Sequence, residues 1–257
     1  MKDKAYLFGP FFGELSWEYF RFAPYAIYLK KISPDIKMIV LTREDRFDLY
    51  GQYADILIPM RIDNESKYDQ SAFKLLNYGD VYYETIAQKF KLLYKERYNI
   101  VDHFYPDISG WRYKVKWQFP RDRMDYSFIP RKKNKEVVEE YLGDLSNIFL
   151  SSRNYGTESD KYKMLYVKDV MEDLKDKIDE KTVTSLGCLI YLIKKSTVVV
   201  STLQQDLGHL AILLRKPLIY LNRRLKNDSV ILMNPLKTKI IDCKTVQEGI
   251  RLYENNI

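Results

Sequence analysis

Short apolar runs that alternate with helical segments are the feature that most restricts the fold of this chain. The runs predicted to be strands lie at 4–10, 36–42, 54–60, 147–152, 197–202, 216–222 and 237–243. Between many of them, apolar residues recur at three- and four-residue spacing, which indicates amphipathic helices, as at 14–31, 81–97 and 207–214. Strand, helix and strand joined by short connections are typical of parallel βαβ construction. We therefore expect an α/β protein with parallel sheets.

The alternation is interrupted and then restarts, which predicts two domains. Residues 61–80 are polar, and residues 99–130 are crowded with aromatic residues, prolines and arginines without a clear period. The pattern then restarts, with expected helices at 161–175 and 187–195 and a possible strand at 181–185. The predicted domains are 1–130 and 131–257, and 257 residues are enough for a core in each.

Composition excludes several classes of protein. A hydrophobic content of 46% argues against a disordered chain. Two cysteines and two histidines make a disulfide framework or a histidine-built metal centre improbable. Neither a signal peptide nor an apolar run of membrane-spanning length is evident, so a cytoplasmic location is expected. The net charge of +7 favours an anionic partner, such as a phosphate-bearing ligand, a nucleic acid or a membrane surface.

Three loops that follow predicted strands carry polar side chains. Ligands of parallel sheets bind in such loops, beyond the carboxyl ends of the strands. The candidate residues are Glu14 in the first loop, Ser152, Arg153 and Asn154 in the second, and Ser201, Thr202, Gln204, Gly208 and His209 in the third.

Each of these loops also has a purely structural interpretation. Glu14 fits a first-turn carboxylate favoured by the helix dipole as well as a general base. Arg153 fits a solvated loop residue as well as a fork that binds a diphosphate. His209 fits a hydrogen-bonded core histidine as well as a phosphate donor at a helix N-terminus. Both interpretations stay open at this point.

Three segments resemble nucleotide-sugar glycosyltransferases of the GT-B fold; the first resembles heptosyltransferase-like members, and the other two a poorly characterised set of glycosyltransferases. They are "VVVSTLQQDLGHLAILLRKPLIYLN", "GPFFGELSWEYFRF" and "FLSSRNYG". In the first, the His-Leu-Ala at 209–211 and the Lys-Pro at 216–217 match, whereas Asp206 stands where the family has glycine. The resemblance implies two facing Rossmann-like domains, with the acceptor bound by the first domain and the nucleotide-sugar donor by the second. It implies no obligatory metal. Glu14 is the predicted base, with Asp102 or His103 as rivals for that role.

A basic and aromatic segment at 111–123 suggests the acceptor. Cations mixed with flat rings hold a phosphate backbone and stack bases, although a solvated basic face has the same composition. The candidate acceptor-binding residues are Trp111, Arg112, Lys114, Lys116, Trp117, Arg121 and Arg123.

Because the chain is small and similar in composition to phage proteins, the leading hypothesis is a phage-type DNA glycosyltransferase. Its acceptor would be hydroxymethylcytosine turned out of the duplex. Three alternatives stay open: a transferase acting on a lipid-linked or cell-surface glycan, a nucleotide-sugar epimerase, and a non-catalytic nucleic-acid-binding protein. The sequence does not indicate an oligomeric state.

Overall fold

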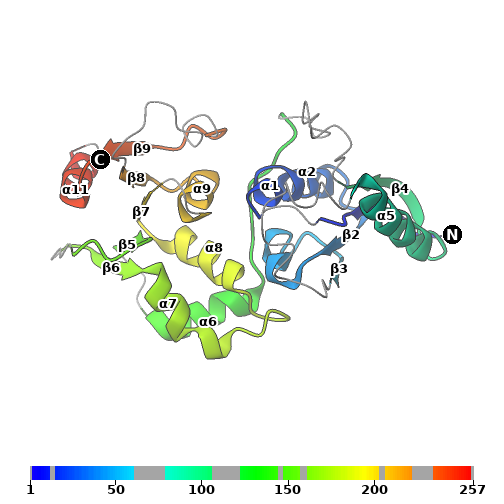
Figure 1. The fold of residues 1–257 in the computed structure, drawn as a ribbon, viewed down its shortest axis with the longest axis horizontal. Helices are drawn as coiled ribbons and strands as arrows, with labels where there is room; N and C mark the ends of the chain where they lie inside the picture. Colours follow the sequence, from blue (N-terminus) through cyan, green and yellow to red (C-terminus); the bar gives the residue numbers. More distant parts are fainter. Residues whose placement is uncertain are drawn as a thin grey trace. The chain divides into compact units, whose positions relative to one another are not determined.

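The computed structural model describes residues 2–11, 15–60, 79–105, 122–143, 147–156, 161–202, 206–221 and 234–255. The chain divides into two compact units, Met1–Ile129 and Pro130–Ile257. Figure 1 shows the course of the chain through both units. Each unit is described by itself below, as unit 1 and unit 2.

Unit 1 contains a four-stranded sheet in the order β3-β2-β1-β4, and every strand pairing in it is parallel. Its strands are β1 (Lys4–Phe8), β2 (Lys37–Thr42), β3 (Ile56–Pro59) and β4 (Asn99–Phe104). Its helical segments are α1 (Leu15–Trp17), the π-helix η1 (Glu18–Phe22), α2 (Ala23–Ile32), the 3-10 helix η2 (Glu44–Leu49) and α5 (Gly79–Lys95).

Helices cover the sheet of unit 1 with apolar side chains. Phe90 of α5 belongs to a buried cluster with Leu7 of β1 and Ile39 of β2. Phe8, the next residue of β1, has its ring 5.5 Å from that of Phe22, which immediately precedes α2. Successive side chains of a strand point to opposite faces of the sheet. The apolar residues of β1 can therefore pack against helical residues on both faces.

Unit 2 contains a five-stranded sheet in the order β6-β5-β7-β8-β9, again with parallel pairings throughout. Its strands are β5 (Ile148–Ser151), β6 (Lys163–Tyr166), β7 (Val198–Ser201), β8 (Leu218–Leu221) and β9 (Ile240–Cys243). Its helices are α6 (Lys132–Leu142), α7 (Val167–Asp173), the 3-10 helix η3 (Lys175–Lys177), α8 (Ser185–Lys195), α9 (Asp206–Leu213) and α11 (Val246–Glu254). In Figure 1, α11 and α9 lie on opposite sides of this sheet.

One core of unit 2 packs α11 against the sheet. Val198 and Val200 of β7 share a buried cluster with Val246 and Tyr253 of α11. Gly249 permits this close approach, because a Cβ built there would lie 2.4 Å from a methyl carbon of Ile219. The helix therefore sits directly over β8 and β9, and its first residue lies next to the carboxyl end of β9.

The predicted fold class is confirmed, and several predicted elements are wrong. The expected helix at 14–31 is divided into α1, η1 and α2, and Pro24 stands in the first turn of α2, where its missing N–H costs nothing. The expected helix at 161–175 instead contains the strand β6 followed by α7. The possible strand at 181–185 is a loop that leads into α8, because Thr184 caps that helix by accepting a hydrogen bond from the Gly187 N–H at 2.8 Å.

Candidate functional site

A cavity of about 560 Å³ lies in unit 2 at the carboxyl ends of the parallel strands. All of its lining residues belong to segments that end a strand, follow one or begin the next helix. They are Arg153, Asn154, Tyr155, Thr202, Leu221, Lys244, Thr245, Val246 and Gln247. This is the position at which parallel α/β sheets bind their ligands.

The loop after β5 is a hydrogen-bonded turn. The Ser151 hydroxyl donates to the Arg153 carbonyl at 2.7 Å, and the Asn154 side-chain oxygen accepts from the Gly156 N–H at 2.8 Å. The hydroxyls of Ser152 and Tyr155 lie 3.2 Å apart. These bonds fix the turn, and within it Arg153 is exposed and lines the cavity.

The segment after β9 starts α11 with a reciprocal cap. The Thr245 hydroxyl accepts from the Glu248 N–H at 3.2 Å, and the Glu248 carboxylate accepts from the Lys244 N–H at 3.0 Å. This resembles a capping box, except that the carboxylate accepts from the N–H of the residue before the N-cap. It fixes the positive end of the helix dipole at the wall of the cavity and holds the Lys244 backbone beside it.

The lining of the cavity suits an anion attached to an apolar body. Among the described lining residues, the charged ones are the cations Arg153 and Lys244. Tyr155, Leu221 and Val246 supply rings and aliphatic carbon and also pack against the buried core of unit 2. A phosphate-bearing ligand with a flat apolar group matches this combination.

Of the described residues predicted around the loop between β7 and α9, only Thr202 lines the cavity. Thr202 lines the cavity, whereas Ser201 is fully buried and its hydroxyl donates to the Thr202 carbonyl at 3.0 Å. A Cβ atom built at Gly208 would lie 3.5 Å from the Ser201 side chain, which is an ordinary van der Waals contact. An alanine would therefore fit at this position. His209 is half-buried on α9 and is not part of the cavity lining.

Two of the three candidate catalytic residues lie at the end of β4 in unit 1. The His103 Nε2–H donates to the Gly9 carbonyl at 2.7 Å, which leaves Nδ1 as the ring nitrogen able to take a proton. Burial lowers the pKa of His103, although the hydrogen bond to Gly9 opposes this, so the ring is neutral near pH 7. Asp102 is exposed, and its carboxylate accepts from the His103 N–H at 2.7 Å.

Other predicted site residues lie outside the described residues. These are Glu14, Trp111, Arg112, Lys114, Lys116, Trp117, Arg121 and Gln204. Arg123 is described and exposed in unit 1, and its charge lowers the pKa of Tyr25, opposing the larger rise caused by burial.

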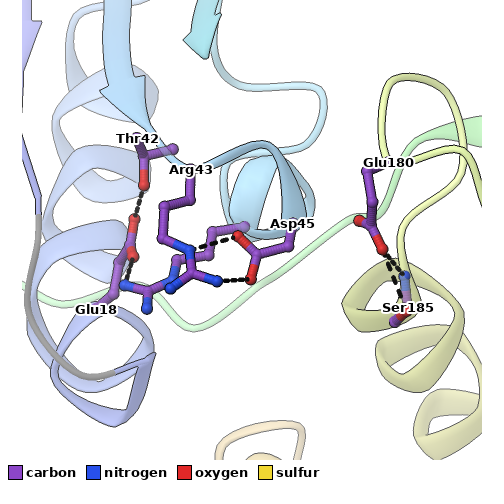
Figure 2. Close-up of polar contacts among 7 residues, drawn as sticks. Glu18, Thr42, Arg43, Asp45, Glu180 and Ser185 are labelled. Carbon is purple, nitrogen blue, oxygen red and sulfur yellow. Dashed lines mark hydrogen bonds and ion pairs between the residues drawn. The ribbon is translucent and has the colours of Figure 1, made fainter. Parts of the chain in front are cut away.

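The sequence analysis missed a buried charge cluster in unit 1. The Glu18 carboxylate, fully buried in η1, accepts hydrogen bonds from Thr42 at 2.7 Å, Tyr50 at 2.7 Å and Arg46 at 2.9 Å. Figure 2 shows the bond from Thr42, which ends β2, and the more exposed pair of Arg43 and Asp45 nearby. Burial raises the pKa of Glu18, and the charge of Arg46 and the hydrogen bonds act in the opposite direction.

The sequence analysis also missed Tyr155, Leu221, Lys244, Thr245, Val246 and Gln247 as lining residues. One sequence signal could have found part of this group. Thr245 is followed three residues later by Glu248, directly after an apolar strand, and this spacing marks a capped helix start.

Within the described ranges, no group of three or more His, Cys, Asp or Glu side chains is arranged to hold a metal ion. Among the helices described, none is long and apolar enough to span a membrane.

Comparisons with known proteins identify similar folds. The crystal structure of the glycosyl transferase family 9 from Veillonella parvula DSM 2008 matches with a TM-score of 0.50 and 12% identity, covering 98% of this chain and 91% of that one. E. coli heptosyltransferase WaaC with ADP matches with a TM-score of 0.49 and 11% identity, covering 99% of each chain. E. coli ADP-heptose lps heptosyltransferase II matches with a TM-score of 0.49 and 11% identity, covering 100% of each chain.

The sequence comparisons give no match. No protein-family model matches the chain, and no curated protein matches it. The structural likeness to the family 9 protein, at 12% identity, bears on the fold alone. The chain has the α/β fold of GT-B glycosyltransferases, built here on a four-stranded and a five-stranded parallel sheet.

Proposed function

We propose that the chain is a glycosyltransferase that takes its sugar from a nucleotide-sugar donor, and that unit 2 binds the donor. The observation that carries this proposal is the cavity at the carboxyl ends of β5, β7, β8 and β9, with Arg153 and Lys244 in its lining. A volume of about 560 Å³ is within the range of small-molecule sites. The fold is one that nucleotide-sugar transferases use, which supports the same conclusion.

The lining divides in a way that fits the parts of such a donor. Tyr155, Leu221 and Val246 offer apolar surface for the base and ribose. Arg153 offers a guanidinium fork, and Lys244 a second cation, for the two phosphates. Thr202 and the start of α11 add hydrogen-bond donors.

The same cations would also assist the chemistry. When the sugar leaves, negative charge develops on the nucleoside diphosphate, and fixed positive groups stabilise that charge. On this proposal Arg153, Lys244 and the α11 N-terminus carry out this role, and no obligatory metal is required. Turnover should therefore persist in EDTA.

The acceptor hydroxyl must lose a proton as its oxygen attacks the sugar. Glu14 stays the proposed base, and Asp102 and His103 stay its rivals. His103 could act only through Nδ1, because Nε2 donates to Gly9. Glu14→Gln should spare donor binding and depress transfer, whereas a fully active variant would assign the base role to another residue.

The test begins with a panel of ADP-, UDP- and GDP-sugars and measures released nucleoside diphosphate. The acceptors are hydroxymethylated DNA, plain DNA and a lipid-linked glycan. Turnover with donor alone would indicate hydrolysis or epimerisation, and DNA binding without donor binding would indicate a nucleic-acid-binding protein. Hydroxymethylcytosine stays the prediction from the sequence, and most of its proposed contacts lie outside the described residues.

A pair of arginine variants isolates the cavity. Arg153→Ala should weaken nucleoside diphosphate binding by about 10- to 100-fold, since a hydrogen bond to a charged group contributes about 1.5–3 kcal/mol. Arg251→Ala removes the same charge from an exposed position of α11 outside the cavity lining and should bind normally. Equal binding by the two variants, or no binding of any nucleoside diphosphate by the unmodified chain, would refute the proposal.

A further inference from the structure

The solvent side of α5 carries large apolar side chains that the core of unit 1 does not use. Leu92 is 52% exposed and Leu93 is 66% exposed. Val101, 47% exposed, lies on β4, the edge strand against which α5 packs (Figure 1). Single exposed leucines are common on protein surfaces, but an adjacent pair on one helix is a feature that needs an explanation.

The inner side of α5 is already occupied by other residues. Ala87 and Phe90 are buried, and Ile86 and Tyr94 pack against the same apolar cluster of the sheet. Leu92 follows Phe90 by two residues and therefore points about 200° away from it around the helix. Packing within unit 1 thus gives no reason for a leucine there.

Cations lie between and beside these leucines. Lys89, Lys91 and Lys95 are all exposed on α5, and the Lys2 ammonium donates to the Lys95 carbonyl at 3.1 Å. Between residues 85 and 97 the chain has four cationic side chains and one carboxylate, Glu96. At 100° per residue, Lys89 projects between Leu92 and Leu93, as does Glu96 just beyond the end of the helix, so charged and apolar groups are mixed around the solvent side of the helix. We call Lys89, Lys91, Leu92, Leu93 and Lys95 the lysine-leucine face.

We propose that the lysine-leucine face binds the surface of an anionic lipid bilayer, with α5 lying in the plane of the interface. Aliphatic side chains enter the boundary between headgroups and acyl chains, while lysines extend along it to reach the phosphates. A protein groove would instead select one continuous apolar stripe, and a nucleic acid would select rings and arginines rather than leucines.

Binding of this kind is peripheral and reversible. One short amphipathic face gives marginal affinity by itself, and the lysines add attraction that anionic lipids supply and salt screens. The inference does not depend on the proposed glycosyl transfer, because it concerns a different surface and is measured without a nucleotide sugar.

The test is co-sedimentation of the full chain with vesicles of phosphatidylcholine, with and without phosphatidylglycerol. The chain should sediment with the anionic vesicles and much less with the neutral ones, and raising the salt from about 0.05 M to about 0.5 M should release it. Equal binding to both vesicle types, or binding to neither, would overturn the proposal. Self-association that requires Leu92 and Leu93 without vesicle binding would also overturn it, in favour of a contact between copies.

Two variants and two controls separate the face from net charge and from exposed apolar area. Replacing Lys89, Lys91 and Lys95 by glutamine should lower partitioning at least about tenfold. The charge control replaces three exposed lysines of unit 2, Lys168, Lys175 and Lys177, and should change partitioning less than about twofold.

Leu92→Gln combined with Leu93→Gln should also lower partitioning at least about fivefold. Its control is Ile32→Gln at the end of α2, where the side chain is 57% exposed. Both leucines are on the surface, so the variant should keep the circular dichroism spectrum and the melting temperature of the unmodified chain. A charge control as damaging as the α5 triple variant, or normal partitioning by the double leucine variant, would refute the role of this face.

Discussion

Glu18→Gln tests the buried charge cluster of unit 1 most directly, because the two side chains have nearly the same shape. Glu18 and Arg46 form an ion pair at 2.9 Å, with side-chain exposures of 0% and 6%. In the variant, one amide oxygen can still accept from Thr42 and Tyr50, but the amide nitrogen would face Arg46 as a second donor. The buried guanidinium would then lose the Glu18 carboxylate as a counter-charge.

The expected cost follows from that burial. Removing one member of a buried ion pair destabilises a protein by about 3–5 kcal/mol, because the remaining charge has lost both water and partner. Unit 1 covers residues 1–129, and a unit of that size has an unfolding entropy of about 0.27 kcal/mol/K. The melting temperature of unit 1 should therefore fall by about 11–18 °C.

Differential scanning calorimetry of three variants checks this reasoning. Asp45→Asn is the control, since Asp45 pairs with Arg43 at 3.0 Å but is 41% exposed, and it should cost less than about 1 kcal/mol. Glu18→Gln combined with Arg46→Met removes the stranded charge and should recover at least about half of the loss. A shift no larger than that of the control, or a double variant less stable than Glu18→Gln, would show that burial of Arg46 is not the cause.

Three further predictions concern single residues. Gly9→Ala should lower the free energy of unfolding, measured in urea, by at least about 3 kcal/mol. The reason is that Gly9 has φ +106° and an added Cβ would lie 2.1 Å from the Leu41 carbonyl oxygen. A loss under about 1 kcal/mol would contradict this. Gly249→Ala should cost about 1–3 kcal/mol, less than Gly9→Ala, because the nearest atoms, at 2.4 Å, belong to a side chain that can shift. Hydrogen bonds from the backbone and side chain of Thr182 lower the pKa of Asp179 to about 2. The ionised Asp179 should therefore stabilise the fold fully above pH 3.8, its ordinary pKa, and this contribution should be lost as the pH falls towards 2. Asp179→Asn should abolish this part of the acid titration of stability, and an unchanged titration would exclude Asp179 as its source.

The strands that the sequence failed to predict share one physical property. β4 and β6 both lie at the edge of a sheet, where burial is partial, as do β3 and β9, which were predicted from their apolar runs. In β4, Asn99, Val101 and Asp102 are exposed, so the strand shows no continuous apolar run. Interior strands such as β7 are buried at every position, and their apolar runs were sufficient to predict them.

Local sequence could indicate the strand-end loops but not the partners of their side chains. The loop after β5 was predicted to carry a ligand-binding arginine, and Arg153 does line a cavity there. Glu18 was missed because its significance depends on Arg46, which is 28 residues away in the chain and is brought to it only by the fold. The apolar neighbours of Glu18 in "LSWEYF" were the available signal, since a carboxylate in such a run must be paired when buried.

The cations at the strand ends are paired differently in the two units, and this difference supports the proposal that unit 2 binds the donor. At the end of β2, Thr42 and the cation Arg46 are both hydrogen-bonded to the buried Glu18 carboxylate, so that cation is already neutralised within the protein. At the ends of β5 and β9, Arg153 and Lys244 instead line a cavity in which no carboxylate is found among the described lining residues. A diphosphate gains most from cations whose charge is not already offset by a carboxylate. This electrostatic difference supports the proposal that an anionic donor binds to unit 2.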